Sequence, residues 1–367
     1  MEKLVVSCGG TGGHFFPGLS IARTFAGQGK KVILLLSGVH AEEQKEIAGS
    51  FGIEAVALPP MPHYRRHPLR FIAGFFRGYR MSVKVLKVFQ PEAMLGMGSF
   101  AALPTVRAAL KCKIPLFLHD GNARIGKANR FFSKKAKFTA TAFPAVNAAA
   151  CRSEVIETGM PLRPELPESA GITKADAINE VNREFGTEFS AELPLILITG
   201  GSQGAAVFNE TIPQALRDVD GKFQVIHLTG KGKLEAAQEL YRQAAFPVLL
   251  RESTGKMAQL LAAADLVFSR SGGSTTAEIA LFGKPAVLIP YPYAAEGHQM
   301  DNARHFGKHG AALVVENSAF TPDKAREIIA GFLQDPEKFR QMGGKMRELA
   351  RPQASEELIS KISAAVD

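Results

Sequence analysis

Three glycine-rich segments each follow an apolar run and precede a helical pattern. They are GGTGG at 9–13, GGSQG at 200–204 and SGGST at 271–275. A helix that starts just after a glycine turn offers free backbone N–H groups and a positive dipole end, which suit a phosphate group. One such turn alone is explained equally well as a tight connection without a ligand, but three in similar positions favour a shared phosphorylated ligand. The sequence contains neither the GxxxxGK[ST] motif of P-loop ATPases nor the GxGxxG dinucleotide motif, since Phe15 stands where the third glycine would fall.

Residues that can transfer protons or bind hydroxyl groups lie beside these turns and at the ends of other apolar runs. His14 opens the helical pattern after the first turn, where the helix dipole favours a neutral imidazole suited to a general base. A lone histidine is, however, more often structural than catalytic. HDGN at 119–122 and EGHQ at 296–299 each follow an apolar run, so we expect their polar side chains at the carboxyl end of a sheet.

Two acidic features allow more than one interpretation. Glu278 lies one turn after the third glycine segment and can either accept the two hydroxyl groups of a ribose or simply complement the helix dipole. Asp218-Val219-Asp220 has the DxD spacing that some sugar-nucleotide enzymes use for a divalent cation. It lies between a helix and the start of a strand, so we interpret it as a solvated loop. Cys8, Cys112 and Cys151 have no CxxC spacing, and we expect neither a metal site nor a cofactor.

Short apolar runs alternate with helix-length patterns along the chain. The runs are KLVVSC, KVILLLS, EAMLGM, PLFLH and KFTATA in the first half, and LPLILITG, FQVIHLTG, PVLLRE, DLVFSR and PAVLIP in the second. This alternation predicts an α/β protein with a doubly wound parallel sheet in each half. Residues 160–193 are polar and contain no strand pattern, so we place the junction near 159–164. The predicted domains are 1–160 and 161–345, with a last helix at about 345–367 that can pack back on the first domain.

The positive charge is confined to the first half of the chain. Residues 1–160 contain 22 Lys and Arg against 9 Asp and Glu, whereas the whole chain contains 44 against 35. A one-sided basic field indicates an anionic partner such as nucleic acid, a phosphorylated substrate or a membrane surface. We find no nucleic-acid-binding module, which disfavours RNA. The start, MEKLVVSCGG, lacks the pattern of a signal peptide, and no apolar stretch reaches spanning length, so we expect a cytoplasmic location.

The segment 67–90 has the pattern of a basic amphipathic helix. A helical arrangement groups its cations on one side and its aromatic and aliphatic residues on others; the cations are Arg70, Arg77, Arg80, Lys84 and Lys87. Such a helix can lie on anionic lipid. Alternatively, its apolar face packs on the sheet and only the cations are exposed. Both hold if only residues 69–76 protrude.

Seven motifs together resemble the MurG family of glycosyltransferases. In chain order they are GGTGGHFFPGLSIA, GMGSFAALP, HDGN, GMPLR, TGGSQGA, RSGGSTTAEIA and EGHQMDNA, and they extend over about residues 1–350. The resemblance implies a GT-B fold, in which two Rossmann-like domains are separated by a deep cleft. It also implies a peripheral enzyme of the cytoplasmic membrane face. That enzyme transfers N-acetylglucosamine from UDP-N-acetylglucosamine (UDP-GlcNAc) to the lipid-linked muramyl peptide lipid I, giving lipid II for peptidoglycan, without a metal.

The resemblance also implies which residues touch the substrates. By position, the substrate-binding residues are Thr11, Gly12, Gly13, Asn122, Arg163, Ser202, Thr254, Gly273, Ser274, Thr275, Thr276, Ala277, Glu278, His298 and Gln299. The donor is expected mainly on the second domain, and the acceptor and membrane on the first. The acceptor's 4-hydroxyl group would attack C1 of the sugar with inversion, with His14 as the first candidate for the base and Asp120 as the second.

The chain departs from the family pattern at two places. The usual HEQN is His119-Asp120-Gly121-Asn122 here, and the usual GNPxR is Gly159-Met160-Pro161-Leu162-Arg163. Three other functions therefore stay open: a different UDP-sugar transferase with a lipid acceptor, a UDP-GlcNAc 2-epimerase, and a binding subunit without activity.

Overall fold

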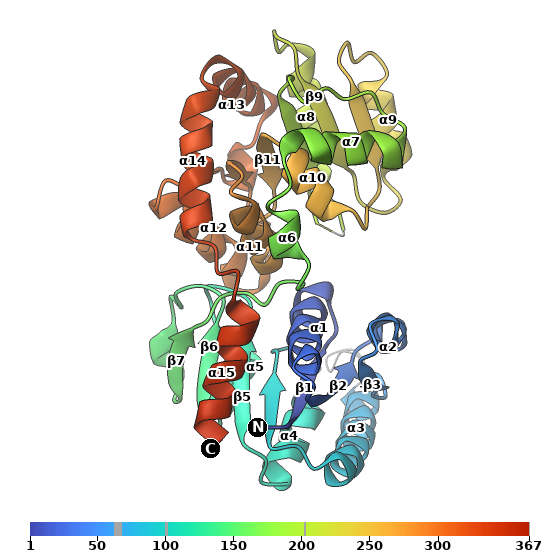
Figure 1. Ribbon diagram of the computed structural model, residues 1–367, viewed down its shortest axis with the longest axis vertical. Helices are drawn as coiled ribbons and strands as arrows, with labels where there is room; N and C mark the ends of the chain where they lie inside the picture. The colour runs from blue at the N-terminus through green and yellow to red at the C-terminus, as the bar shows by residue number, and fades with distance from the viewer. Residues whose placement is uncertain (62–67, 100–101, 202, 367) are drawn as a thin grey trace. The chain divides into compact units, whose positions relative to one another are not determined.

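The computed structural model describes residues 1–61, 68–99, 102–201 and 203–366 (Figure 1). The chain forms two compact units. The first contains Met1–Pro164 together with Arg351–Asp367, and the second contains Glu165–Ala350. Each unit is built on one parallel β-sheet with helices on both faces.

The sheet of the first unit has seven strands in the order β3-β2-β1-β4-β5-β6-β7, and all neighbours are parallel. The strands are β1 Lys3–Gly9, β2 Lys31–Ser37, β3 Glu54–Ala57, β4 Ala93–Gly96, β5 Leu116–Asp120, β6 Phe138–Thr141 and β7 Glu154–Glu157. The helices are α1 Gly12–Gly27, α2 Ala41–Ser50, α3 Pro68–Phe89, α4 Leu103–Lys111, α5 Lys127–Ser133, the 3₁₀ turn η2 Ala148–Ala150 and α15 Ala354–Val366. The chain winds outward from β1 in one direction and then returns to β4 on its other side. The topological switch point of this sheet therefore lies between β1 and β4.

Alternate residues of β1 contribute side chains to two separate hydrophobic cores. Leu4 and Val6 belong to the core that α1 and α15 cover, whereas Val5 belongs to the core under α3 and α4. Because side chains alternate across a strand, a strand buried on both faces is apolar at nearly every position. The last helix adds Leu358 and Ile362 to the first of these cores.

The second unit repeats the same plan with six parallel strands in the order β10-β9-β8-β11-β12-β13. The strands are β8 Leu195–Thr199, β9 Gln224–Leu228, β10 Val248–Arg251, β11 Leu266–Ser269, β12 Ala286–Leu288 and β13 Ala312–Val314. The helices are α6 Leu166–Ser169, α7 Lys174–Phe185, α8 Ala206–Arg217, α9 Leu234–Tyr241, α10 Met257–Ala263, α11 Gly273–Phe282, η3 Ala295–Gly297, α12 His298–Lys308, η4 Asn317–Ala319, α13 Pro322–Gln334 and α14 Pro336–Glu348. Its switch point lies between β8 and β11.

All ten predicted strands are confirmed, and the structure contains three further strands that the sequence pattern does not predict. These strands, β3, β7 and β13, all lie at sheet edges. Edge strands are only half covered, and β3 and β7 accordingly place exposed glutamates beside half-buried aliphatic residues. A search for continuous apolar runs finds central strands and overlooks such edges.

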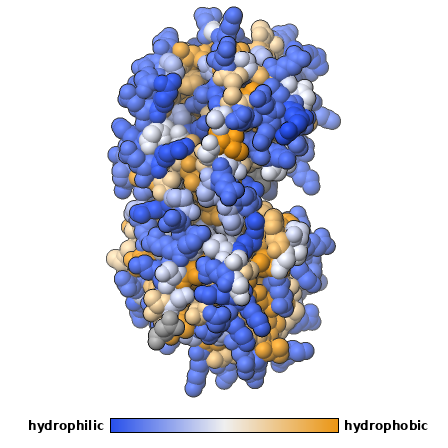
Figure 2. Space-filling view, viewed as in Figure 1, coloured by the Kyte–Doolittle hydropathy of each residue, from blue (hydrophilic) through white to orange (hydrophobic). Residues whose placement is uncertain are grey.

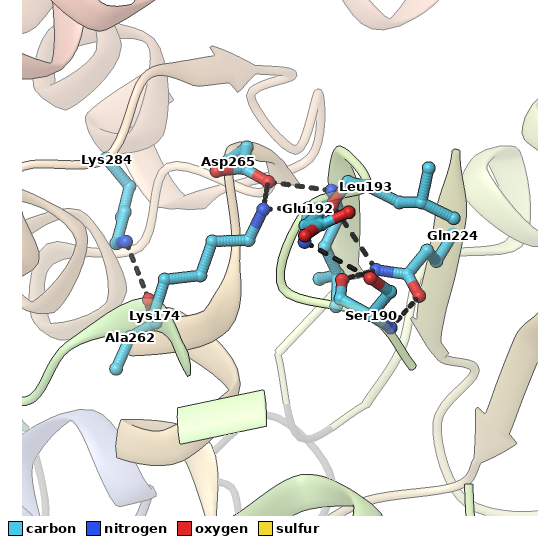
Figure 3. Close-up of polar contacts among 9 residues, drawn as sticks. Lys174, Ser190, Glu192, Leu193, Gln224, Ala262, Asp265 and Lys284 are labelled. Atoms are coloured by element: carbon cyan, nitrogen blue, oxygen red, sulfur yellow. Dashed lines mark hydrogen bonds and ion pairs between the residues drawn. The ribbon is translucent and has the colours of Figure 1, made fainter. Parts of the chain in front are cut away.

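Polar contacts tie the amino-end loops of the second sheet together (Figure 3). Asp265 accepts hydrogen bonds from the Leu195 backbone N–H at 2.8 Å and from the Lys174 ammonium at 2.7 Å. The buried amide of Gln224 donates to the Ser190 carbonyl at 2.7 Å and accepts from its N–H at 2.6 Å. Lys284 donates to the Ala262 carbonyl at 2.8 Å, and burial lowers its pKa to about 8. These groups fasten loops at the end of the sheet opposite the glycine segments, where ligands of such sheets are not bound.

Candidate functional site

The first glycine segment follows β1, at the switch point of the first sheet. Its first two glycines have positive φ angles, +112° for Gly9 and +86° for Gly10. A Cβ atom on Gly9 would lie 2.5 Å from the Ser37 carbonyl oxygen, and one on Gly38 would lie 2.8 Å from the Cα of Gly10. These glycines are therefore required for the loop after β1 to pack against the loop after β2.

The other two glycines of the segment have a different setting. Gly12 and Gly13 begin α1 and are exposed, and a Cβ atom on either would find its nearest neighbours at 3.4 Å and 3.9 Å respectively. The first N–H groups of an α-helix have no partner within the helix. Gly12 and Gly13 therefore form a bare helix start that an anionic group can approach closely.

His14 lies in the first turn of α1, beside the loop that follows β4. Its Nδ1 atom is 3.0 Å from the hydroxyl oxygen of Thr11, the N-cap residue. A Cβ atom on Gly98, which has φ +86°, would lie 3.5 Å from the edge of the imidazole ring. When the Thr11 hydroxyl accepts from Nδ1–H, the neutral ring carries its lone pair on Nε2. That arrangement suits a general base.

Asp120 is anchored in a way that leaves it little freedom. Its side chain is only 7% exposed. One carboxylate oxygen accepts from the Gly126 N–H at 2.8 Å and from the Asn129 amide at 3.0 Å, and the other accepts from Asn122 at 3.4 Å. Asp120 therefore holds the loop between β5 and α5 in place, and these contacts favour His14 over Asp120 as the base.

The neighbouring His119 is fully buried and binds the Gly159 carbonyl through Nε2 at 3.0 Å. Burial lowers its pKa, which keeps the ring neutral. Its hydrogen bond joins the end of β5 to the segment that carries Met160 and Arg163. Arg163 itself is half-buried.

The two departures from the family pattern touch each other. A Cβ atom on Gly121 would lie 2.9 Å from the methyl carbon of Met160. Met160 is buried, with 3% of its side chain exposed. The methionine thus occupies space that a larger residue at position 121 would need, so the two departures fit together in one packing arrangement.

The second glycine segment follows β8, at the switch point of the second sheet. A Cβ atom on Gly204 would lie 2.0 Å from the Thr229 carbonyl oxygen, and one on Gly230 would lie 2.6 Å from the Gln203 carbonyl oxygen. This loop is therefore packed backbone against backbone on the loop after β9. Ser202, which the resemblance assigns to the substrate, lies outside the described residues.

The third glycine segment follows β11 and is joined to the segment that contains EGHQ. The buried Ser271 hydroxyl donates to the Gln299 carbonyl at 2.8 Å, and the buried Asn302 amide donates to the Ser271 carbonyl at 3.0 Å. The Gln299 side-chain oxygen accepts from the Tyr291 N–H at 2.9 Å. His298 begins α12, and its Nδ1 atom is 2.9 Å from the Ala295 carbonyl. The structure thus brings the predicted residues at 273–278 together with His298 and Gln299.

Within the third segment the predicted residues are not equivalent. Thr276 is buried, and its hydroxyl donates to the carbonyls of Gly272, the N-cap residue of its helix, and Gly273 in the first turn. The half-buried residues of the first turns of α11 are Ser274, Thr275, Ala277 and Glu278. Thr254 lies in the loop between the edge strand β10 and α10, and its hydroxyl accepts from the Lys256 N–H at 2.9 Å.

Sequence reasoning overlooks the residues that fasten these loops from inside. Asn129 and Asn302 are buried amides within helices, and a buried asparagine on the apolar face of a helix is the signal that could identify them. Arg270 begins one of the family motifs, but the sequence assigns it no role. Its guanidinium donates to the Ile289 and Pro290 carbonyls and to Asn317, at 2.8–3.1 Å.

The acidic triplet at 218–220 lies at the amino end of the second sheet. Asp218 and Asp220 line a pocket of about 550 Å³ together with Arg326, whose guanidinium pairs with Asp218 at 3.4 Å. Within the described ranges, no cluster of three or more His, Cys, Asp or Glu residues could hold a metal ion.

Two doubly wound parallel sheets with glycine loops at their switch points are the architecture of the GT-B class of glycosyltransferases. Family models confirm this class, since residues 4–141 match the glycosyltransferase family 28 N-terminal domain and residues 195–358 match its C-terminal domain. The chain is 31% identical to the UDP-N-acetylglucosamine–N-acetylmuramyl-(pentapeptide) pyrophosphoryl-undecaprenol N-acetylglucosamine transferase of Desulforamulus reducens, over 97% of each chain. It is 32% identical to the enzyme of that name from Actinobacillus pleuropneumoniae, over 98% of each chain. The protein belongs to this family of N-acetylglucosaminyltransferases, the MurG family.

Solved structures agree with this assignment. MurG of Acinetobacter baumannii superposes with a TM-score of 0.78 at 26% identity, covering 99% of this chain and 100% of that one. A UDP-GlcNAc 2-epimerase from Neisseria meningitidis, solved with UDP-GlcNAc bound, has a TM-score of 0.72 at 15% identity, covering 99% and 100% of the two chains. The second likeness shows a shared fold only.

Replacing Gly38 by alanine should impair activity by displacing the loop after β1. The new Cβ atom would lie 2.8 Å from Gly10 and displace the loop that carries Gly12 and His14. Gly29→Ala is the matched control, because Gly29 also has a positive φ of +76° but nothing lies within 4 Å of its Cβ position. Gly29→Ala should lose about 1–2 kcal/mol of unfolding free energy for the left-handed backbone, and Gly38→Ala should lose more because its Cβ atom also meets the backbone of Gly10. Only Gly38→Ala should lose most of its transferase activity, and equal activity in the two variants would show that the loop position is unimportant.

Proposed function

We propose that this protein transfers N-acetylglucosamine from UDP-GlcNAc to undecaprenyl-pyrophosphoryl-N-acetylmuramyl-pentapeptide (lipid I), giving lipid II for peptidoglycan synthesis. The observation that carries the proposal is the identity of 31–32% to enzymes named for this reaction over almost the full length of each chain. The glycine loops at the two switch points provide the anion-binding geometry that a nucleotide diphosphate requires.

The donor is assigned mainly to the second domain. The start of α11 at Gly273 follows the glycine turn and presents N–H groups and a positive dipole end to the diphosphate. Glu278 lies one turn further on, at the distance along a helix where a carboxylate can accept hydrogen bonds from ribose hydroxyl groups. His298 and Gln299, which are joined to the same loop through Ser271, are assigned to the sugar, and Thr254 is assigned to uracil.

The acceptor is assigned to the first domain, with His14 as the general base. The 4-hydroxyl oxygen of the muramyl sugar attacks C1 of N-acetylglucosamine from the face opposite the leaving group. Its proton passes to Nε2 of His14, while the bond from C1 to the UDP oxygen breaks and the electron pair leaves on UDP. Gly12 and Gly13 at the start of α1, and the Arg163 guanidinium, are assigned to the charge that develops on the diphosphate.

We further propose a peripheral location on the cytoplasmic face of the membrane. The five predicted cations of α3 are all exposed, as are Leu69, Ile72 and Phe76 near its start. The later part of α3 packs inward instead, with Leu86 in the core and Val83 and Phe89 against it. None of the helices that the structure describes is both long enough and apolar enough to cross a bilayer. Apolar and polar surface lie interspersed over this unit in Figure 2.

The reaction is tested with radiolabelled UDP-GlcNAc and a short-chain lipid I analogue, following the label into the lipid phase. We expect label in the lipid product only when the muramyl-pentapeptide headgroup is present. Transfer to diacylglycerol would assign a different lipid acceptor, and label recovered as UDP-N-acetylmannosamine would assign an epimerase. If no turnover of any kind is detected, the protein is assigned as a binding subunit without activity.

His14→Ala should lower kcat by about 10²–10⁴-fold, since general-base catalysis contributes a factor of that size. Its dissociation constant for UDP should stay within twofold of the wild-type value. Thr11→Val should lower kcat by a smaller factor, because it removes the hydroxyl that bonds to Nδ1, and Thr11→Ser should restore it. A kcat for His14→Ala within a few-fold of the wild type would return His14 to a structural role.

Replacing Ile72 and Phe76 together by serine should weaken binding to anionic vesicles about tenfold or more. These side chains are 50% and 53% exposed near the start of α3. Val88→Ser is the control, since Val88 is 79% exposed at the other end of the same helix. Flotation with anionic and neutral vesicles measures the effect, and added salt should weaken binding to the anionic vesicles only. Equal binding of the wild type to both lipid types would show that electrostatic attraction does not contribute. An equal loss of binding with Val88→Ser would show that the start of α3 is not the part that faces the membrane.

A further inference from the structure

A line of buried polar side chains crosses the second unit from α9 to the loop after β9. The Tyr241 hydroxyl is 3.0 Å from Nδ1 of His227, and Nε2 of His227 is 3.0 Å from the side-chain oxygen of Asn209. The Asn209 amide nitrogen in turn donates to the Thr229 carbonyl at 3.0 Å. All four residues are less than 9% exposed, and His227 is completely buried.

Only one arrangement of protons satisfies the neutral line. The Thr229 carbonyl can only accept, so the Asn209 side chain must present its NH₂ group to it and its oxygen to His227. That oxygen requires a proton on Nε2 of His227, which leaves Nδ1 to accept from the Tyr241 hydroxyl. Burial lowers the pKa of His227 to about 3, so the ring is neutral throughout the physiological range.

The line ends at the point where two loops meet without room for a side chain. The Thr229 carbonyl that Asn209 binds is the atom 2.0 Å from the Cβ position of Gly204. The next residue, Gly230, packs on Gln203 and Gly204 in the same contact, and the Lys233 ammonium donates to the Gln203 carbonyl at 2.8 Å. A displacement of Thr229 is therefore transmitted directly to the glycine loop after β8.

Burying a tyrosine, a histidine and an asparagine costs free energy unless every polar atom is paired, and apolar residues would fill the same space at lower cost. A fully paired buried network instead fixes one geometry. Here the geometry that it fixes is that of a loop assigned to the donor diphosphate.

We propose that His227 is a positioning residue for the donor site: together with Tyr241 it orients the Asn209 amide, which holds Thr229 and Gly230 against Gly204. His227 itself is buried and acts through Asn209. The inference rests on the proposed function only because UDP is taken as the ligand whose affinity reports the position of the loop.

The test is the dissociation constant for UDP, measured by calorimetry on the full-length protein. His227→Phe keeps a buried ring but removes both hydrogen bonds, and we expect UDP to bind at least tenfold more weakly. The KM for UDP-GlcNAc should rise by a similar factor, while kcat at saturating donor and the KM for the lipid acceptor stay within about twofold. His227→Gln, which can still donate to Asn209, should recover part of the affinity.

Gln224→Leu is the matched control. Gln224 is equally buried in the same strand, β9, but it binds Ser190 at the amino end of the sheet. It should reduce stability without changing the UDP affinity. Where His227→Phe fails to fold, Tyr241→Phe removes a single oxygen atom and should weaken UDP binding about threefold.

The outcomes separate the two proposals. UDP affinity in His227→Phe and Tyr241→Phe that equals the wild-type value would overturn the positioning role, as would an effect no larger than that of Gln224→Leu. Wild-type protein that does not bind UDP would instead overturn the proposed function.

Discussion

The arrangement of the molecule depends on how closely loop backbones approach each other at the switch points of the two sheets. Beside β1 the loops after β1 and β2 come within distances that no Cβ atom permits, at Gly9 against Ser37 and at Gly38 against Gly10. Beside β8 the same is true of Gly204 against Thr229 and Gly230. These close backbone contacts determine where α1 begins and which path the loop before α8 follows. The start of α1 and that loop in turn carry candidate ligand-binding groups. A glycine here is required by neighbouring protein before any ligand is considered.

The polar side chains at the amino end and at the carboxyl end of the second sheet have different roles. At the amino end, Asp265 and Gln224 bind backbone groups of neighbouring loops and so close the sheet. At the carboxyl end, Ser271, Asn302 and Arg270 join the loops after β11 and β12, and the candidate donor residues project from these same loops. The acidic triplet at 218–220 lies at the amino end, opposite the end at which ligands of such sheets are bound.

Much of this architecture could be predicted from the sequence, because central parallel strands are apolar on both faces and glycine turns are local signals. Edge strands such as β3 and β7 escaped prediction because their pattern is only half buried. The inward roles of Asp120 and Ser271 escaped it for another reason. Asp120 is bound by Asn129, nine residues away, and Ser271 by Asn302, 31 residues away. Partners at such separations become neighbours only in the folded chain, so residue type and spacing could not distinguish a loop anchor from a substrate ligand.

The central claim is that the loops at the carboxyl ends of the central strands bind the donor. Hydrogen–deuterium exchange with and without saturating UDP-GlcNAc tests it most directly, since bound ligand slows the exchange of the amides that it contacts. We predict slower exchange in peptides covering 200–206 and 271–279, with no change in peptides covering 186–195 and 218–222 at the amino end of the sheet. Protection confined to the pocket at 218–222 and 323–334, with none at the two glycine loops, would contradict the account.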